Sequence, residues 1–371
     1  MIEFDVIGIT PFARPDTGLV RGLCRAGALG VLDLGCDADR ARAALAGLAR
    51  RNPNRGLGVL VRRGLPLEPS ELPECVTVVV LEAGREIEPW RRRPVLVQVT
   101  SIHEAYAAAA SGASGLIAKG IEAGGRVGEQ TTFVLLQEIV GALRLPVWAQ
   151  GGIGIHTAPA CIAGGARGVV LDSQLALVRE SRLPEAVRQA IGSMDGSETT
   201  LVAGHRVFSR PDLDLPARGD LEPGEVARLL GADDLRRQLL PAGQDAAFAR
   251  NLATRFRTAG GVVAAIRKAI DRSVKAAQST EPLAPHSPLA ELHGTRYPIV
   301  QGPMTRVSDR AAFAEAVAAA GGLPFLALSM LPAGAARELL RETKERLGRR
   351  AWGVGILGFV PEELQIGRAH V

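Results

Sequence analysis

The sequence lacks the patterns of a metal-binding, disulfide-bonded, secreted or membrane-spanning protein. Its four cysteines, Cys24, Cys36, Cys75 and Cys161, lie far apart and form no Cys-x-x-Cys or Cys/His ligand spacing. No apolar run reaches the roughly 18 residues that a membrane helix needs, and the acidic start 1–5 is unlike a signal peptide. We therefore expect a cytoplasmic protein with no metal site and no membrane partner.

The chain also lacks a segment dominated by charges of one sign. Lys and Arg number 44 and Asp and Glu 39, and the two signs are interspersed along the whole length. This distribution disfavours a nucleic-acid partner. Apolar residues make up 47% and charged residues 22%, a globular balance, and the 43 glycines indicate tight turns or close approach of the backbone to a ligand. A small-molecule partner fits these properties best.

Short apolar runs rich in β-branched residues alternate with longer amphipathic segments in the first half of the chain. Such runs mark strands that are buried on both faces, as in a parallel sheet covered by helices. The pattern predicts eight strands, at Phe4–Thr10, Leu29–Leu34, Gly56–Val61, Val76–Glu82, Pro94–Thr100, Gly115–Lys119, Pro146–Gln150 and Gly168–Asp172. Eight parallel strands favour a closed (β/α)₈ TIM barrel over an open sheet, and we assign it to residues 1–181.

The segment after the predicted barrel has a different pattern. Residues 182–280 contain helical stretches broken by glycine and proline, which predict a mainly helical cap or extension. Residues 281–295, which include Pro282, Pro285 and Pro288, have the composition of a linker.

Residues 296–365 repeat the beginning of the chain. The first strand, the first helix and the next two strands have counterparts in the same order, for example Gly56–Leu60 and Trp352–Ile356. The repeat predicts an incomplete second barrel of the same type, since a whole one needs about 250 residues. Residues 366–371 can be encoded by a DNA string used as a sequencing-library adapter, so we expect that they are an artefact and that the natural gene continues.

The segment Gly115–Gly128 carries a specific family resemblance. It contains Glu122-Ala123-Gly124-Gly125, which resembles the glycine loop after the sixth strand of nitronate monooxygenases. The similarity continues through Pro146–Ile153 and Gly164–Ser173, and it recurs in the second copy. The chain is therefore similar to the nitronate monooxygenase and FMN-dependent enoyl-reductase family, especially to the tandem regions of large polyketide and polyunsaturated fatty acid synthases.

The resemblance implies FMN at the carboxyl ends of the strands. In such barrels a cofactor phosphate commonly lies on the loops after strands seven and eight. We expect the loops at Pro11, Glu122–Gly128, Gly151–Ile153 and Asp172–Ser173 to converge there. The implied cofactor-binding residues are Thr10, Pro11, Gly124, Gly125, Gln150, Gly151, Gly152, Asp172 and Ser173 in the first copy, and Gln301, Gly302, Pro303 and Met304 in the second.

Two positions depart from the family pattern. Arg126 replaces the family histidine, and an arginine can hold an anion but cannot abstract a proton. Asp172-Ser173 replaces the usual Gly-Thr, and a carboxylate beside a phosphate is unfavourable unless it points away. Arg126 is either a catalytic group that points into the barrel mouth or a residue tied to an acid such as Glu122 or Glu129.

Two further residues are catalytic candidates. His156 begins the helix after strand seven, where it either caps the helix or substitutes for the missing base, and Lys119 ends strand six, where its side chain can point into the mouth. Three functions stay open: nitronate oxidation with O₂, reduction of an enoyl thioester with NAD(P)H, and a scaffold without catalysis. The synthase context would add an acyl carrier protein and downstream synthase domains as partners.

Overall fold

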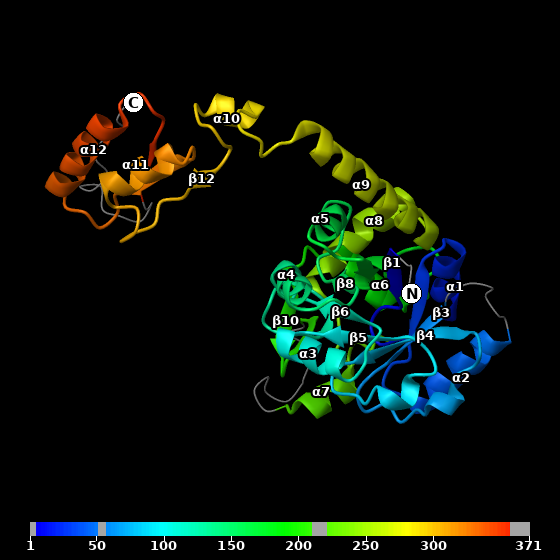
Figure 1. Ribbon diagram of the computed structural model, residues 1–371. Coiled ribbons are helices and arrows are strands. Elements are labelled where there is room, and N and C mark those ends of the chain that lie inside the picture. The colour runs from blue at the N-terminus through cyan, green and yellow to red at the C-terminus, as the bar shows by residue number, and fades with distance from the viewer. Residues whose placement is uncertain (1–4, 51–56, 210–220, 357–371) are drawn as a thin grey trace. The chain divides into compact units, whose positions relative to one another are not determined.

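The computed structural model describes residues 5–50, 57–209 and 221–356 of the chain (Figure 1). The chain divides into two compact units, residues 1–274 and 275–371. Each unit is described by itself. The predicted adapter residues 366–371 lie outside the described residues.

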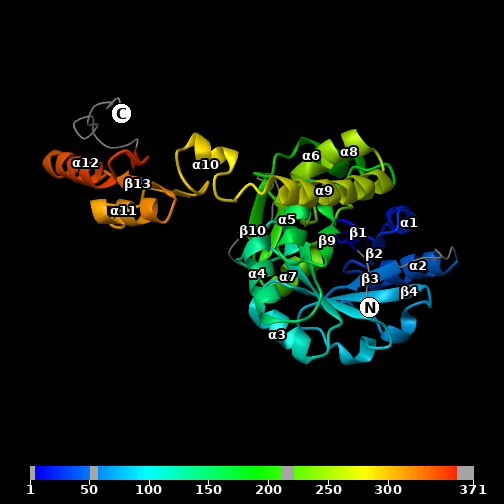
Figure 2. The ribbon, with the colours of Figure 1, turned by 45° about the horizontal axis from the view of Figure 1, so that its top comes forward.

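The first unit contains a closed, all-parallel, eight-stranded barrel, which confirms the predicted fold class (Figures 1 and 2). Its strands follow one another around the barrel in chain order. They are β1 (Val6–Ile9), β2 (Leu29–Asp33), β3 (Leu57–Val61), β4 (Val76–Glu82), β5 (Val95–Val99), β6 (Gly115–Lys119), β8 (Val147–Gln150) and β9 (Gly168–Leu171). All eight predicted strands are present, with ends that differ by at most two residues.

Side chains on alternate positions of each strand fill the inside of the barrel. These residues form a separate apolar cluster that consists of Ile7, Ile9, Leu29, Val31, Leu60, Val78, Val80, Leu96, Ile117, Trp148 and Val170. Residues one position away on the same strands, such as Val79 and Leu116, belong to the larger core beneath the helices. Successive side chains of a strand point to opposite faces, so the buried runs serve both cores at once.

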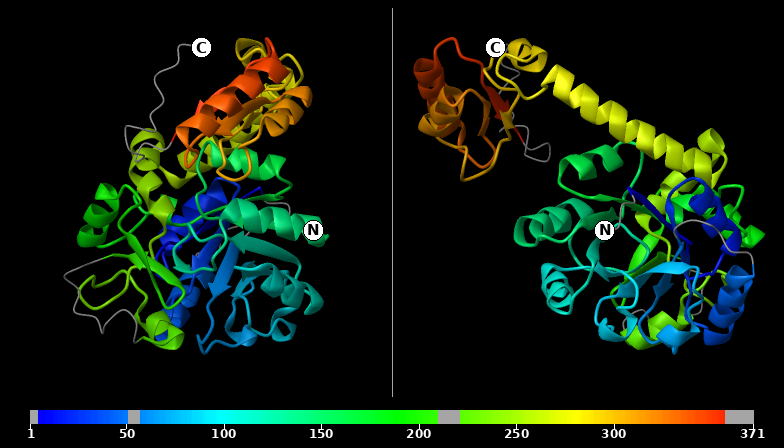
Figure 3. Two further views of the ribbon diagram at one scale, coloured as in Figure 1. Left: turned by 90° about the vertical axis from the view of Figure 1, so that its left-hand side faces the viewer. Right: turned by 45° about the vertical axis from the view of Figure 1, so that its right-hand side comes forward.

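Helices cover most of the outside of the barrel (Figure 3). They are α1 (Thr17–Arg25), α2 (Ala38–Ala49), α3 (Ile102–Ala110), α4 (Thr132–Ala142) and α5 (Thr157–Ala163). Asp16, Asp37, Ser101 and Thr131 accept hydrogen bonds from the first free backbone N–H groups of α1, α2, α3 and α4. After β3 and β4 the connections contain only the short 3₁₀ turns η1 (Pro69–Glu71) and η2 (Glu88–Trp90).

The segment after β9 is built mostly of helices, and it also contains a hairpin that the sequence analysis did not predict. A hairpin of β10 (Thr199–Val202) and β11 (His205–Phe208) pairs with the two-residue strand β7 (Gly125–Arg126) in the loop after β6. The remaining elements are η3 (Ser173–Leu175), α6 (Glu185–Ser193), α7 (Pro223–Leu229), η4 (Gln244–Ala247), α8 (Phe248–Phe256) and α9 (Ala259–Thr280). Figure 2 shows α6, α8 and α9 together beside the barrel, and Val262, Val263 and Ile266 of α9 join its outer core.

The second unit contains the predicted repeat of the barrel's first elements. A short helix, α10 (Pro288–Leu292), lies in the segment predicted as a linker. Then follow β12 (Val300–Gln301), α11 (Ala311–Ala319), β13 (Leu323–Ala327), α12 (Ala333–Leu347) and β14 (Gly353–Gly355). The three strands are parallel and neighbours in chain order, like β1, β2 and β3. Among the described helices of the chain, none combines the length and the apolar character needed to cross a bilayer.

Candidate functional site at the carboxyl ends of the barrel strands

A ring of buried polar side chains closes the inside of the barrel at the carboxyl ends of its strands. Side chains of a strand alternate between its two faces, so the residue two positions after the last apolar residue of the interior also points inward. At that position seven strands place a polar residue, and we call these residues the polar ring: Asp33, Arg62, Glu82, Gln98, Lys119, Gln150 and Asp172. All seven are buried.

One side of the polar ring is an ion-pair triad. The Arg62 guanidinium donates to both Asp33 carboxylate oxygens, at 2.6 to 3.2 Å, and to Glu82 Oε1 at 3.3 Å. Burial alone raises the pKa of Glu82, but the charge of Arg62 and the backbone N–H of Arg63 outweigh it, so this pKa lies below its usual value. The positive charge of Arg62 therefore offsets the charges of the two acids, and its guanidinium is already hydrogen-bonded to both.

The other side of the polar ring is a chain of amides that ends on a carboxylate. Gln98 Nε2 donates to Gln150 Oε1 at 2.7 Å, and Gln150 Nε2 donates to Asp172 Oδ2 at 2.7 Å. The other carboxylate oxygen of Asp172 accepts from the backbone N–H of Ser173 at 2.6 Å. Asp172 thus points along the ring and also takes up an N–H group of the loop after β9.

Lys119 is the exception in the polar ring. Its side chain is only 5% exposed, yet within the described part of the chain no group forms a hydrogen bond or ion pair with its Nζ. Burial and the charge of Arg62 lower its pKa to about 8, against the opposing effect of Asp172 and Glu82. A buried amine with a perturbed pKa beside acids is typical of functional sites, although structural clusters shift pKa values too.

Arg126 is bound to an acid on a neighbouring element. It lies on β7, opposite His205 of β11, and its guanidinium forms an ion pair with Glu104 of α3 and donates to Thr100 Oγ1 at 2.9 Å. The acid is neither Glu122 nor Glu129, the two acids that the sequence suggested. Glu122 instead accepts hydrogen bonds from the backbone N–H and hydroxyl of Thr132.

The glycine loop after β8 is held by a residue from far along the chain. Gly151 and Gly152 adopt positive φ angles of 110° and 64°, which glycine tolerates, so the Gly152 N–H can turn toward Asp245. That N–H donates to Asp245 Oδ2 at 3.2 Å, and Gln174 Nε2 donates to the same oxygen at 2.9 Å. Asp245 is 1% exposed, and its Oδ1 has no hydrogen-bond partner among the described residues. Burial, with the nearby charges of Asp172 and Glu122, raises its pKa well above the usual value.

The segment that carries Asp245 packs on the glycine loop after β6. The backbone N–H of Gln244 donates to the carbonyl of Glu122 at 2.9 Å. A Cβ atom at Gly124 would collide with the carbonyl oxygen of Pro241, so only glycine permits this approach. We call residues Pro241–Asp245 the covering segment. Phe12, in the loop after β1, packs with Ala242 and Ala246.

The remaining predicted site residues are distributed as follows. The Thr10 hydroxyl accepts from the backbone N–H of Asp33, and Pro11 is buried. His156 is exposed at the start of α5, and its side chain makes no capping hydrogen bond. In the second unit, Gln301 Oε1 accepts from the Phe325 N–H, while Met304 is 58% exposed. Gly302 and Pro303 lie between them, also exposed.

The described residues of the first barrel do not fit an FMN phosphate. The N–H groups of Gly152 and Ser173, which the resemblance assigns to the phosphate, donate to Asp245 and Asp172 instead. Three acids, Glu122, Asp172 and Asp245, lie near enough to influence one another there. A phosphate dianion needs free donors, and here these two donors already bind carboxylates that would repel it.

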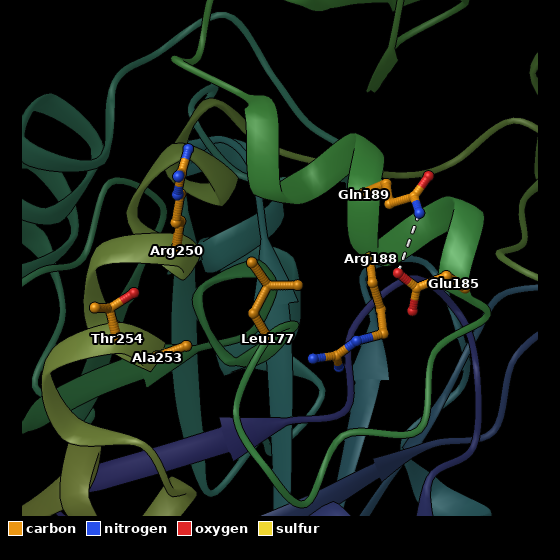
Figure 4. A pocket seen from close by; sticks show the side chains of 7 residues that line it. All are labelled: Leu177, Glu185, Arg188, Gln189, Arg250, Ala253 and Thr254. Carbon is orange, nitrogen blue, oxygen red and sulfur yellow. Dashed lines mark hydrogen bonds between the residues drawn. The ribbon is translucent and has the colours of Figure 1, made fainter.

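A separate hollow of about 360 Å³ lies outside the barrel (Figure 4). It is lined by Leu177, Glu185, Arg188, Gln189, Arg250, Ala253 and Thr254 of α6, α8 and the segment before α6. None of these residues belongs to the polar ring. At its edge, Gln189 Nε2 donates to Glu185 Oε1 of the same helix at 3.2 Å. Its polar groups are open to solvent, so it offers no preorganised chemistry.

Comparison with known proteins finds a family similarity in the barrel. Residues 93–210, from β5 to the end of β11, match the family model of nitronate monooxygenases. This part of the chain is therefore similar to that family. The matched range holds Gln98, Lys119, Gln150 and Asp172 of the polar ring, together with Arg126.

Curated relatives match part of this chain. A protein of Mycobacterium tuberculosis named as a monooxygenase is 33% identical over 160 residues, which are 40% of this chain and 42% of that protein. An octahydro-1H-indene-carboxyl-CoA dehydrogenase of Rhodococcus jostii is 34% identical over 122 residues, 31% of this chain and 34% of the relative. The chain thus spans less than half the length of the curated relatives it matches.

Solved structures share the fold. FabK from Thermotoga maritima superposes with a TM-score of 0.63 at 24% identity, over 75% of this chain and 96% of that one. A nitroalkane oxidase from Streptomyces ansochromogenes superposes with a TM-score of 0.59 at 22% identity, over 74% and 97% of the two chains. The first barrel therefore shares its architecture with these proteins.

Sequence reasoning missed Asp33, Arg62, Glu82, Gln98, Glu104 and Asp245. The four in the polar ring carry a readable signal, because each follows the last interior apolar residue of its strand by two positions. Glu104 and Asp245 have no such signal in the sequence. Their partners Arg126 and Gly152 lie 22 and 93 positions away along the chain.

Proposed function

We propose that this chain is part of an oxidoreductase of the nitronate monooxygenase and enoyl-reductase type whose first barrel does not hold FMN. One observation carries the second half of the proposal: the carboxyl of Asp245 accepts the hydrogen bond of the Gly152 N–H, which the phosphate would need. The oxidoreductase class is supported by the family match and by relatives named as a monooxygenase and a dehydrogenase.

The flavin in this proposal belongs to the second copy of the fold. Gln301-Gly302-Pro303-Met304 follows β12 and is the segment through which the second copy resembles the family, whereas the first copy has Thr10-Pro11-Phe12 at the same place. Met304 is exposed, so this loop is not covered as the first barrel's glycine loops are. The first barrel then serves as a flavin-free companion domain, in keeping with the ion pair of Arg126 and Glu104.

A second candidate function keeps FMN in the first barrel, where it would oxidise a nitronate with O₂ or reduce an enoyl thioester with NAD(P)H. The Oδ1 of buried Asp245, which has no hydrogen-bond partner among the described residues, favours it, because an unsatisfied buried oxygen lowers the cost of moving the covering segment away. The resemblance to synthase regions adds a proposed setting for either candidate, with an acyl carrier protein as partner.

A flavin-binding measurement decides between the two candidates. We expect the purified chain to be colourless and to leave the fluorescence of added FMN unquenched, because the phosphate donors of the first barrel are occupied and the described part of the second copy has only three strands. A flavoprotein with the same fold, purified and titrated in parallel, shows that the assay detects binding. Stoichiometric FMN in the purified chain would contradict the proposal and support the second candidate.

A further inference from the structure

In the second unit, strand β14 has one open edge. Among the described residues it pairs with β13 alone, whereas its counterpart in the first unit, β3, pairs with β2 on one side and β4 on the other. Every strand of the closed first barrel has neighbours on both sides, so none of them is free to fill this place. An open edge presents unpaired backbone N–H and C=O groups, with which another strand can pair.

The glycine face of β14 is filled. Glycine alternates with apolar residues in Trp352–Ile356, so the two glycines share one face of the strand. A Cβ atom on Gly353 would collide with the ring of Phe325, and one on Gly355 would collide with Pro303. These two side chains therefore lie directly on the strand, and the glycines permit their approach.

The opposite face of β14 carries an apolar stripe that is partly uncovered. The stripe consists of Trp352, which packs against the core of the second unit, and of Val354 and Ile356, which are 39% and 45% exposed. By strand register, the last two correspond to Val59 and Val61 of β3, which are fully buried. The stripe lacks the cover that the first unit gives to the same positions.

The other open edge of this sheet is blocked. Pro298 stands two positions before β12 and Pro303 two positions after it, and proline, which has no N–H, keeps an edge from pairing. Strand β14 contains no proline. Its Gly355 carbonyl accepts from the Leu328 N–H on the side of β13, and successive residues direct their backbone groups to opposite edges. The N–H and C=O of Val354 therefore point to the open edge.

We propose that this chain forms a dimer in which β14 pairs antiparallel with β14 of a second molecule, about a two-fold axis at Val354. A partner strand must offer a free edge and apolar side chains at alternate positions, and β14 itself has both. The axis places Val354 opposite Val354 of the partner subunit, and Trp352 opposite Ile356 of the partner subunit. Aromatic and β-branched residues stabilise such cross-strand pairs, so the two stripes merge into one apolar cluster. This dimer does not depend on FMN binding in either unit.

The pairing edge is short, so the dimer is weak. Its residues form a smaller contact than the roughly 800 Å² per partner of a standard interface, and we expect a dissociation constant of about 10 to 100 µM. Sedimentation velocity of the full chain, from about 1 to 500 µM, should show monomers giving way to dimers as the concentration rises. A chain that stays monomeric over this range would overturn the proposal.

Single charges on exposed strand edges locate the interface. Val354→Lys puts two like charges opposite each other and removes two apolar side chains from the contact, so dimerisation should weaken at least about tenfold. Because Val354 is partly exposed, the unit keeps its core. Leu201→Lys is the matched control, since Leu201 is 47% exposed on β10, an edge strand of the hairpin sheet in the first unit. It should leave the dimer unchanged, and a dimer lost in Leu201→Lys but kept in Val354→Lys would put the interface at β10 instead.

A mixing experiment tests the register. Val354→Glu should also weaken the dimer by itself, because two carboxylates then lie opposite each other. Mixed with Val354→Lys, it should form mixed dimers at least about threefold more tightly than either variant pairs with itself, since a residue that faces itself brings the opposite charges together. An isotope label on one variant lets native mass spectrometry distinguish the mixed dimers from the self-paired ones. Equal affinities of all three dimers would contradict pairing about Val354.

Discussion

Replacing Arg62 with methionine will lower the free energy of unfolding of the first unit by about 3 to 5 kcal/mol at pH 7, as expected when one partner of a buried ion cluster is removed. Arg62 is nearly inaccessible and donates four hydrogen bonds to Asp33 and Glu82. Without the guanidinium, two carboxylates stay inside the barrel without the cation that forms their ion pairs. Urea unfolding followed by far-UV circular dichroism measures the loss.

A matched control is available on the surface of the same unit. Arg42 also contacts two acids, Asp39 and Glu71, but its side chain is half exposed. Ion pairs that are open to solvent contribute little to stability, so Arg42→Met should leave the free energy of unfolding almost unchanged. Equal losses in the two variants would show that the buried cluster contributes nothing beyond an exposed one.

The pH dependence of the Arg62→Met variant gives an independent check. In the wild type the pKa of Glu82 is lowered, so its contribution is present above the unfolded pKa and is lost as the pH falls. Without Arg62, burial raises that pKa above the unfolded value. The folded variant then binds a proton more readily than the unfolded chain, and its deficit should shrink as the pH falls through the raised pKa. Adding Asp33→Asn and Glu82→Gln should recover most of the stability at pH 7.

The barrel was predictable because each of its strands contributes side chains to two cores, one inside the barrel and one beneath the helices. A run such as Val76–Glu82 is apolar on both faces, and short segments of this kind alternate with amphipathic helices. The hairpin β10–β11 was not predicted, because its strands have only four residues each. The apolar Leu201 on its exposed face also breaks the alternation of polar and apolar residues. Its partner β7 has only two residues, too few for any periodicity. Pairing of such short strands depends on tertiary contacts.

The site was predictable only where a motif marked it. Lys119, Gln150 and Asp172 end strands next to glycine loops, so a sequence reading can place them at the mouth. Glu82 was read only as a strand end and Arg62 fell one residue beyond its predicted strand, although the two-residue repeat of a strand extends the interior through both. Asp245 lies 93 positions after Gly152, and only the tertiary fold brings the covering segment back to the glycine loop. The sequence around Asp245 does not show this contact.

Opening the glycine loops by substitution should create the phosphate site that the first barrel lacks. Asp245→Ala frees the Gly152 N–H and Gln174 Nε2, which now donate to its carboxyl. Asp172→Gly frees the Ser173 N–H and restores the residue that the family resemblance expects. Each hydrogen bond to a charged group contributes about 1.5 to 3 kcal/mol, and removing a carboxylate about 4 Å away saves about 4 kcal/mol at an effective dielectric constant of 20.

The double variant should bind inorganic phosphate and FMN at least about a hundredfold more tightly than the wild type, since every 1.4 kcal/mol is a factor of ten. Calorimetry with phosphate and quenching of FMN fluorescence measure the two affinities. Asp271→Ala removes an exposed acid of α9 and serves as the control for overall charge. Unfolding temperatures of all variants confirm that the barrel is intact.

The single variants distinguish how the two acids exclude phosphate. Asp245 has a raised pKa and acts mainly by occupying donors, so its removal should improve binding by a factor that changes little with salt. Asp172 acts partly through its charge, so the gain from Asp172→Gly should fall as ionic strength rises. The two acids influence each other, so the gains should not simply add, and the double-mutant cycle measures their coupling. If the double variant binds phosphate no better than Asp271→Ala, the carboxylates are not what excludes it.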